Sequence, residues 1–126
     1  MYNFIKSFFK SWKYAWDGIR FCFGKEQNLT LITLVSIIVI ACGFYFKISF
    51  GEWIAVVMLI TAVLSLELFN TSLEHFLDLF HPEINTKVKN IKDLIAGGVA
   101  IVSIGAAVIG SIIFLPKIIM LFQIYF

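Results

Sequence analysis

Three long stretches of this chain contain no charged residue, and they constrain its fold more than any other feature. Residues 28–46 and 94–115 are uncharged throughout, and residues 53–66 are uncharged before a polar segment begins. At about 1.5 Å of rise per helical residue, each stretch can belong to a helix that crosses a hydrocarbon core about 30 Å thick. A mean hydropathy of +0.94 lies far outside the range of soluble domains. We therefore predict an all-α integral membrane protein.

One domain covering residues 1–126 accounts for the whole sequence, because neither an internal repeat nor a low-complexity linker is visible. Within it we predict span one at residues 28–47, span two with a cytoplasmic extension at 51–80, and span three at 92–116. Residues 1–27 instead mix aromatic residues with lysines and an arginine at helical spacing, which is typical of an amphipathic helix on the membrane surface.

The distribution of basic residues predicts the orientation. Five precede the first span and three lie between the second and third, against one in each remaining segment. The positive-inside bias places the N-terminus and the second loop in the cytoplasm. A net charge of +2 is too small to suggest a nucleic-acid partner, and the basic residues lie where anionic membrane lipids would attract them.

Span two contains a carboxylate, Glu67, in a helical pattern with other polar residues. An acid inside a membrane span is costly and is by default a functional-site hypothesis. Asn70, Thr71, Glu74 and Asp78 follow it at i+3, i+4, i+7 and i+11, so all five share one face of a helix. Given the orientation above, this polar face lies at the cytoplasmic end of span two.

Charged residues from three segments reach this same membrane depth. Glu26 precedes span one and Glu74 ends span two, and carboxylate oxygens suit Mg²⁺. Lys92 is a natural partner for phosphate, and Asp93 is placed to orient it or a nucleotide. Glu67, the deepest carboxylate, is placed to accept the proton of a lipid hydroxyl. This set favours phosphoryl transfer, which needs mainly positioning and charge neutralisation.

Two other functions fit parts of the pattern. Acids in membrane helices also line proton or cation pathways in small oligomers, and polar residues also join helices in an inactive structural subunit. The charged groups here gather at one edge, whereas a pathway would place polar groups through the full depth. His75 and His81 are expected to be surface residues and not ligands.

Small residues recur along one face of span three, which predicts close helix packing. They are Ala96, Ala100, Ser103, Ala107 and Ser111. Three helices enclose little volume, so we expect a homo-oligomer whose sites include groups from neighbouring protomers.

Two motifs together resemble a known family. Glu67-Leu-Phe-Asn-Thr-Ser-Leu-Glu74, followed by Lys92-Asp-Leu-Ile-Ala-Gly97, is similar to the signature of the prokaryotic diacylglycerol kinases and undecaprenol kinases. Residues 16–20 and 26–28 resemble the same family, so the likeness covers nearly the whole chain. It implies a homotrimer of three-span subunits with an N-terminal surface helix, in the bacterial cytoplasmic (inner) membrane.

The resemblance also implies an activity and roles for individual residues. The family transfers the γ-phosphate of ATP to a lipid alcohol, either undecaprenol or diacylglycerol, with Mg²⁺. Glu67 would be the catalytic base, and Glu26 and Glu74 the metal ligands facing ATP. The remaining residues that would contact the nucleotide or support the site are Tyr14, Asn70, Lys92 and Asp93.

Overall fold

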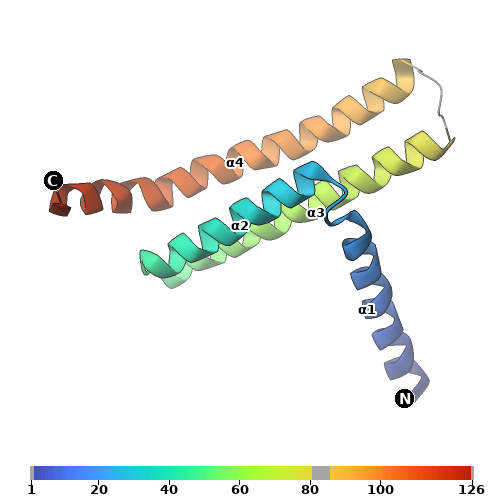
Figure 1. Cartoon of the computed structure of the whole chain (residues 1–126), viewed down its shortest axis with the longest axis horizontal. Coiled ribbons are helices and arrows are strands. Elements are labelled where there is room, and N and C mark those ends of the chain that lie inside the picture. Colours follow the sequence, from blue (N-terminus) through green and yellow to red (C-terminus); the bar gives the residue numbers. More distant parts are fainter. Residues whose placement is uncertain (1, 81–85, 126) are drawn as a thin grey trace.

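A computed structural model of the chain describes residues 2–80 and 86–125, and these residues form four helices without a strand (Figure 1). They are α1 (Tyr2–Cys22), α2 (Gln27–Tyr45), α3 (Phe50–Phe80) and α4 (Thr86–Tyr125). By length and hydropathy, α2, α3 and α4 are able to cross a membrane. The prediction of an all-α membrane protein with three spans is therefore confirmed.

The three apolar helices lie side by side as a bundle, in which α3 packs against both α2 and α4 (Figure 1). We call its two ends the Glu26 end, where α2 begins, and the turn end, where α2 and α3 are joined. Most of the large apolar side chains remain exposed on the single chain, among them Leu31, Ile101 and Ile104. Such an outer surface fits lipid or neighbouring subunits.

The surface helix α1 leaves the Glu26 end at a steep angle to the bundle (Figure 1). Gly24, with a φ of 79°, makes the turn between α1 and α2 possible, because this backbone conformation is costly for residues with a Cβ. A bundle that spans the membrane would thus hold α1 along the membrane surface.

The α2–α3 connection is short and tightly packed. Ser49 and Glu52 cap α3 reciprocally: the Ser49 amide donates to Glu52 Oε2 (2.6 Å) and the Glu52 amide donates to Ser49 Oγ (3.4 Å). Ile48 in the turn is buried. Gly43 lies so close to Trp53 that a Cβ at this position would be 2.8 Å from the indole ring.

The bundle helices differ in length, and this difference decides what lies outside the membrane. At 19 residues, α2 is about 28 Å long, close to the thickness of the hydrocarbon core. The 31 residues of α3 and the 40 residues of α4 are longer than a single crossing needs. Helix α4 therefore extends beyond residues 92–116 at both ends, and it contains Pro116.

Candidate active site

The face of α3 that packs into the bundle changes from apolar to polar along its length. Its buried residues recur at helical spacing and are Val56, Val63, Glu67, Asn70 and Thr71. Further along the same face, Glu74 is half-buried and Asp78 is exposed. The polar stripe expected on one side of this helix is thus turned toward the protein, and it emerges from the bundle at the Glu26 end.

Glu67 is the most buried carboxylate of the described residues, with 4% of its surface exposed. The side chain of Asn28, in the first turn of α2, lies beside its carboxyl group. Glu26 and Glu74 are close enough to act on Glu67 electrostatically. Three carboxylates, two on α3 and one on the residue directly before α2, are therefore gathered at one end of the bundle.

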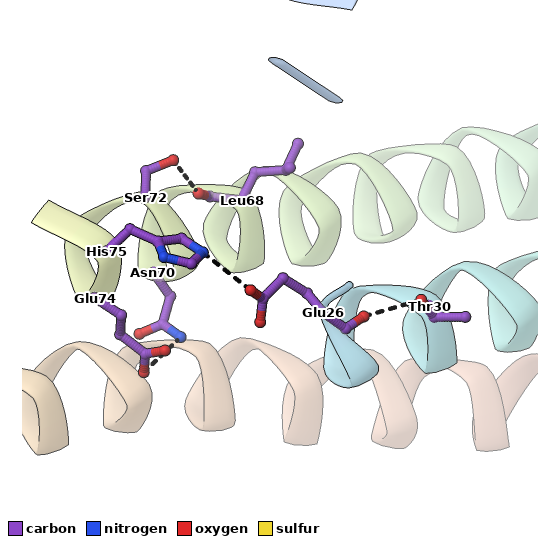
Figure 2. A network of polar contacts seen from close by, with 7 residues as sticks. All are labelled: Glu26, Thr30, Leu68, Asn70, Ser72, Glu74 and His75. Carbon is purple, nitrogen blue, oxygen red and sulfur yellow. Dashed lines mark hydrogen bonds and ion pairs between the residues drawn. The ribbon is translucent and has the colours of Figure 1, made fainter. Parts of the chain in front are cut away.

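Glu26 is held at the N-terminus of α2 by its backbone and by a residue of α3. Its carbonyl accepts hydrogen bonds from the amide and hydroxyl groups of Thr30, at 3.2 and 2.9 Å. Its carboxylate lies 3.0 Å from Nε2 of His75 (Figure 2). This contact joins the start of α2 to the polar end of α3.

His75 is the residue of this site that the sequence did not reveal. Its neighbours on α3 gave no sign of a role, since it lies off the stripe that contains Glu67 and Glu74. Its partner, Glu26, is 49 positions away in the sequence, so the contact becomes visible only once α2 is packed against α3. His81, the other histidine considered, lies outside the described residues.

Asn70 has one satisfied and one unsatisfied polar atom. Its Nδ2 donates to Glu74 Oε1 at 3.4 Å, one turn along α3 (Figure 2). Its Oδ1 is buried and has no hydrogen-bond partner among the described residues. A buried acceptor without a donor is costly, so this atom marks a place where a ligand donor would be stabilised.

The structure brings Lys92 to the same end of the bundle, although its partner is unexpected. The Lys92 ammonium forms an ion pair with Asp78 of α3. Asp93 is exposed on α4. Tyr14 lies on α1, which points away from the bundle, and its 60% exposed ring has Lys10 Nζ at 5.8 Å. Of the seven expected site residues, Tyr14 alone comes from α1.

The carboxylates present fit a loosely held divalent cation better than an all-protein metal cage. Among residues 2–80 and 86–125, there is no group of three or more histidine, cysteine or acidic side chains arranged to hold a metal. Mg²⁺ typically takes one or two carboxylates and completes its shell with water and phosphate oxygens. Glu26 and Glu74, gathered with Glu67, suit that kind of binding.

An apolar groove of about 590 Å³ runs between α2, α3 and α4 on the membrane-embedded side of this cluster. Val63, one helical turn before Glu67, is among the lining residues, together with Ile32 and Val35 of α2. Ser36, Ser103 and Ser111 are the hydroxyl-bearing residues of the lining. On α3 the groove thus runs from Val56 to Val63 and ends one helical turn before the buried carboxylate.

Comparison with known proteins connects this arrangement to a family. The sequence profile of the prokaryotic diacylglycerol kinases matches residues 13–114. The undecaprenol kinase of Bacillus subtilis is 36% identical over 92% of this chain and 94% of its own length. The diacylglycerol kinase of Synechocystis is 32% identical over 88% of this chain and 64% of its own length. The chain therefore belongs to the prokaryotic diacylglycerol kinase family, and it is a lipid kinase.

Proposed function

We propose that this protein transfers the γ-phosphoryl group of ATP to the hydroxyl of a membrane lipid alcohol, in a reaction that needs Mg²⁺. The observation that carries the proposal is the position of Glu67, a buried carboxylate between an apolar groove and a cluster of acidic and polar residues. A lipid hydroxyl from the bilayer and a phosphate from water can meet at this depth. We place the site at the cytoplasmic face of the inner membrane, where the positive-inside bias puts the Glu26 end.

Glu67 acts in this proposal as the general base. It lies one helical turn beyond Val63, the last lining residue of the groove on α3, so a hydroxyl that extends past this end of the groove can give its proton to Glu67 as the oxygen attacks the γ-phosphorus. Asn28 beside the carboxyl group holds it in place. Proton acceptance by a positioned group typically contributes about 10²- to 10⁴-fold to a rate.

Glu26 and Glu74 hold the metal in this proposal. When bound, Mg²⁺ would neutralise charge on the β- and γ-phosphates and orient them. Glu26 directly precedes α2 and Glu74 lies on α3, and each carboxylate already has a neighbour that contacts it, His75 for Glu26 and Asn70 for Glu74. These neighbours restrict the carboxylates before any ligand arrives, which lowers the cost of ordering them.

Asn70 supports the reacting groups through its unsatisfied Oδ1. The amide nitrogen is used by Glu74, so the oxygen is the atom left to accept a hydrogen bond. A lipid hydroxyl or a water bound to the metal supplies such a donor. Asn70 would thereby connect the metal-binding carboxylate with the acceptor position.

Lys92, Asp93 and Tyr14 are proposed to contact the nucleotide. Lys92 is paired with Asp78, whose side chain is 63% exposed, whereas that of Lys92 is 29% exposed. An exposed ion pair is weak, so a triphosphate can replace Asp78 as the partner of the ammonium group. Tyr14 needs α1, or α1 of a neighbouring protomer, to approach the site.

The groove between the three helices is proposed to hold the hydrocarbon chain of the acceptor. Its lining is almost entirely apolar, as a lipid chain requires. Undecaprenol is the acceptor we favour over diacylglycerol, because an undecaprenol kinase aligns along nearly its whole length at 36% identity.

A homotrimer is the proposed assembly. Ala96 and Ala100 on α4 are exposed on the single chain and lie outside the groove lining, and the glycines at 97, 98 and 105 have open space around them. Such a surface allows another helix to approach closely. Neighbouring protomers would then complete the nucleotide side of each site.

A phosphotransfer assay tests the proposed function. The purified protein is placed in vesicles that contain undecaprenol or diacylglycerol at equal mole fraction, with Mg²⁺ and ATP labelled at the γ-phosphate. We expect label in undecaprenyl phosphate at a higher rate than in phosphatidic acid. Faster labelling of diacylglycerol would show that diacylglycerol is the preferred acceptor and would still support phosphotransfer to a lipid alcohol. Transfer to neither alcohol would refute the proposed function.

A further inference from the structure

Helix α4 continues past the rest of the bundle at the turn end. Lys117 Nζ lies 2.5 Å from Glu52 Oε1 in the first turn of α3, so Lys117 is level with the α2–α3 turn. Lys47 in that turn is exposed, and an exposed lysine marks the depth at which water begins. Residues 118–124, which we call the distal segment, lie beyond this level (Figure 1). At 1.5 Å per residue they extend about 10 Å further.

The distal segment is apolar over more than half of its circumference. It contains no charged residue, and its single polar side chain is Gln123. Ile119, Met120 and Ile124 are 54%, 63% and 76% exposed. Because successive residues are rotated by about 100° around a helix, Met120 and Ile124 share one face and Ile119 lies on the neighbouring face. Phe122, 60% exposed, lies on the far side of Ile119, so the exposed apolar side chains spread over roughly 200° of the circumference. A helix that is apolar over more than half of its circumference requires an apolar environment over the same arc.

We propose that the distal segment is embedded in the boundary between acyl chains and headgroups of the leaflet opposite the candidate active site, as a second membrane anchor. Lys117 and the α2–α3 turn lie at the membrane surface, so the distal segment begins directly beside the bilayer. The bilayer also covers the whole exposed arc of roughly 200° on the distal segment, whereas a single helix of a second copy would cover a narrower strip. The bilayer is therefore the occupant that matches the exposed residues.

Pro116 gives the helix a place to bend toward the membrane plane. Proline has no amide hydrogen, so the carbonyl of Ile112 loses its usual helical partner, and helices bend at such points. On the next residue, the Lys117 ammonium donates to the carbonyl of Ile113 at 3.2 Å and also pairs with Glu52. The bend and the ion pair lie at the same level, directly before the segment.

Pro116, Lys117 and the distal segment lie beyond residues 13–114, the part of the chain that the family profile matches. With α1 on one face of the membrane and the distal segment on the other, the bundle would be restrained at both surfaces. Such restraint fixes the depth at which α4 presents Lys92 at the Glu26 end.

Fluorescence quenching in lipid nanodiscs tests the anchor, because both membrane faces are accessible there. The full-length chain, with Cys22→Ala and Cys42→Ala, receives one cysteine labelled with the environment-sensitive dye NBD. The test positions are Ile119→Cys, Met120→Cys and Ile124→Cys. The control variants are Ile104→Cys, exposed in the middle of α4, and Lys89→Cys, exposed near its start. Each variant is first required to be monodisperse in size-exclusion chromatography.

Two quenchers are compared: iodide in the water and nitroxide groups on lipids just below the headgroups. We expect strong lipid quenching at all three test positions, and iodide quenching several-fold weaker than at Lys89→Cys. Ile104→Cys should resist iodide and respond best to a nitroxide placed deep in the acyl chains. Iodide access at the test positions would overturn the proposal by showing the segment in water. Protection from both quenchers would also overturn it, since protein would then cover the segment.

Discussion

Nε2 of His75 on α3 lies 3.0 Å from the carboxylate of Glu26, the residue that precedes α2. The imidazole ring also contacts the ring of Phe21 near the end of α1, at a centroid distance of 6.4 Å. The Lys25 ammonium covers that same phenyl ring at 4.1 Å. Residues from α1, α3 and the turn between α1 and α2 thus form a series of contacts that ends on one carboxylate, and this carboxylate is a proposed Mg²⁺ ligand.

Replacing His75 by alanine is expected to weaken the binding of MgATP. The contact is half-exposed, and its loss is worth about 0.5–1 kcal/mol, so KM for MgATP should rise about two- to five-fold. The turnover number should change less, because Glu26 itself remains. Steady-state kinetics with varied MgATP measures both constants. His75→Gln is the matched control, since its amide N–H can still donate to Glu26. Equal losses in the two variants would contradict a positioning role.

Glu67→Gln is expected to abolish phosphotransfer while the protein stays folded. The substitution keeps the size and polarity of the side chain but removes the proton acceptor, so turnover should fall by about 10²- to 10⁴-fold. The measurement is the transfer of labelled phosphate to lipid. The control is Ser72→Ala, an exposed position on the same helix whose hydroxyl donates to the Leu68 carbonyl one turn back. Turnover by Glu67→Gln at the rate of this control would exclude Glu67 as the base.

Glu74→Gln is expected to raise the Mg²⁺ concentration needed for half-maximal activity. The variant retains an oxygen that can accept from Asn70 but loses the negative charge that attracts the cation. A Mg²⁺ titration at saturating ATP measures the change, which we expect to be at least tenfold, or about 1.4 kcal/mol. Asn70→Ala separates the two effects, because it removes the hydrogen bond and keeps the carboxylate. An unchanged Mg²⁺ response in Glu74→Gln would remove Glu74 from the metal site.

Lys92 has two partners to distinguish, Asp78 in the structure and a phosphate in the proposal. Lys92→Gln is expected to raise KM for ATP about tenfold or more, whereas Asp78→Asn should leave it unchanged or lower it slightly. The reason is that Asp78 competes with the nucleotide for the same ammonium group. Equal increases of KM in both variants would show that the ion pair between Lys92 and Asp78 stabilises the fold, and that Lys92 does not bind ATP directly.

The sequence predicted the parts of this fold that depend on periodicity within one helix. The uncharged stretches indicated three spans, and the spacing of Glu67, Asn70 and Thr71 placed them on the buried face of α3, where the structure has them. Both results depend on residues a few positions apart, for which helix geometry alone decides the direction of each side chain.

Patterns within a single helix could not predict contacts between helices. His75 was expected on the surface, and its bond to Glu26 arises only from the way α2 packs on α3. The ion pair of Lys92 with Asp78 arises in the same way from the packing of α4 on α3. Span three was predicted at residues 92–116, and α4 is longer, Thr86–Tyr125, because the charges used to bound a span do not end a helix. Charged residues mark the edge of a membrane, and helices continue through that edge.

Gly43 provides a test of the packing at the turn end, far from the proposed chemistry. A Cβ on this residue would be 2.8 Å from Cη2 of Trp53 and 3.2 Å from Cδ1 of Ile48. Trp53 cannot retreat freely, since its ring packs on Phe44 at a centroid distance of 4.8 Å. Overpacking of this kind costs about 1–3 kcal/mol, which exceeds the gain of about 0.5–1 kcal/mol from replacing glycine by alanine in a helix.

Gly43→Ala is therefore expected to lower the melting temperature in detergent. The matched control is Gly51→Ala in the first turn of α3, where a Cβ meets no atom within 4 Å. The same substitution there lowers the conformational entropy of the unfolded chain and causes no clash, so the melting temperature should stay the same or rise. Opposite signs in the two variants would attribute the effect to the contact with Trp53. A stabilising Gly43→Ala would instead mean that α2 and α3 are less closely packed at this turn than the structure shows.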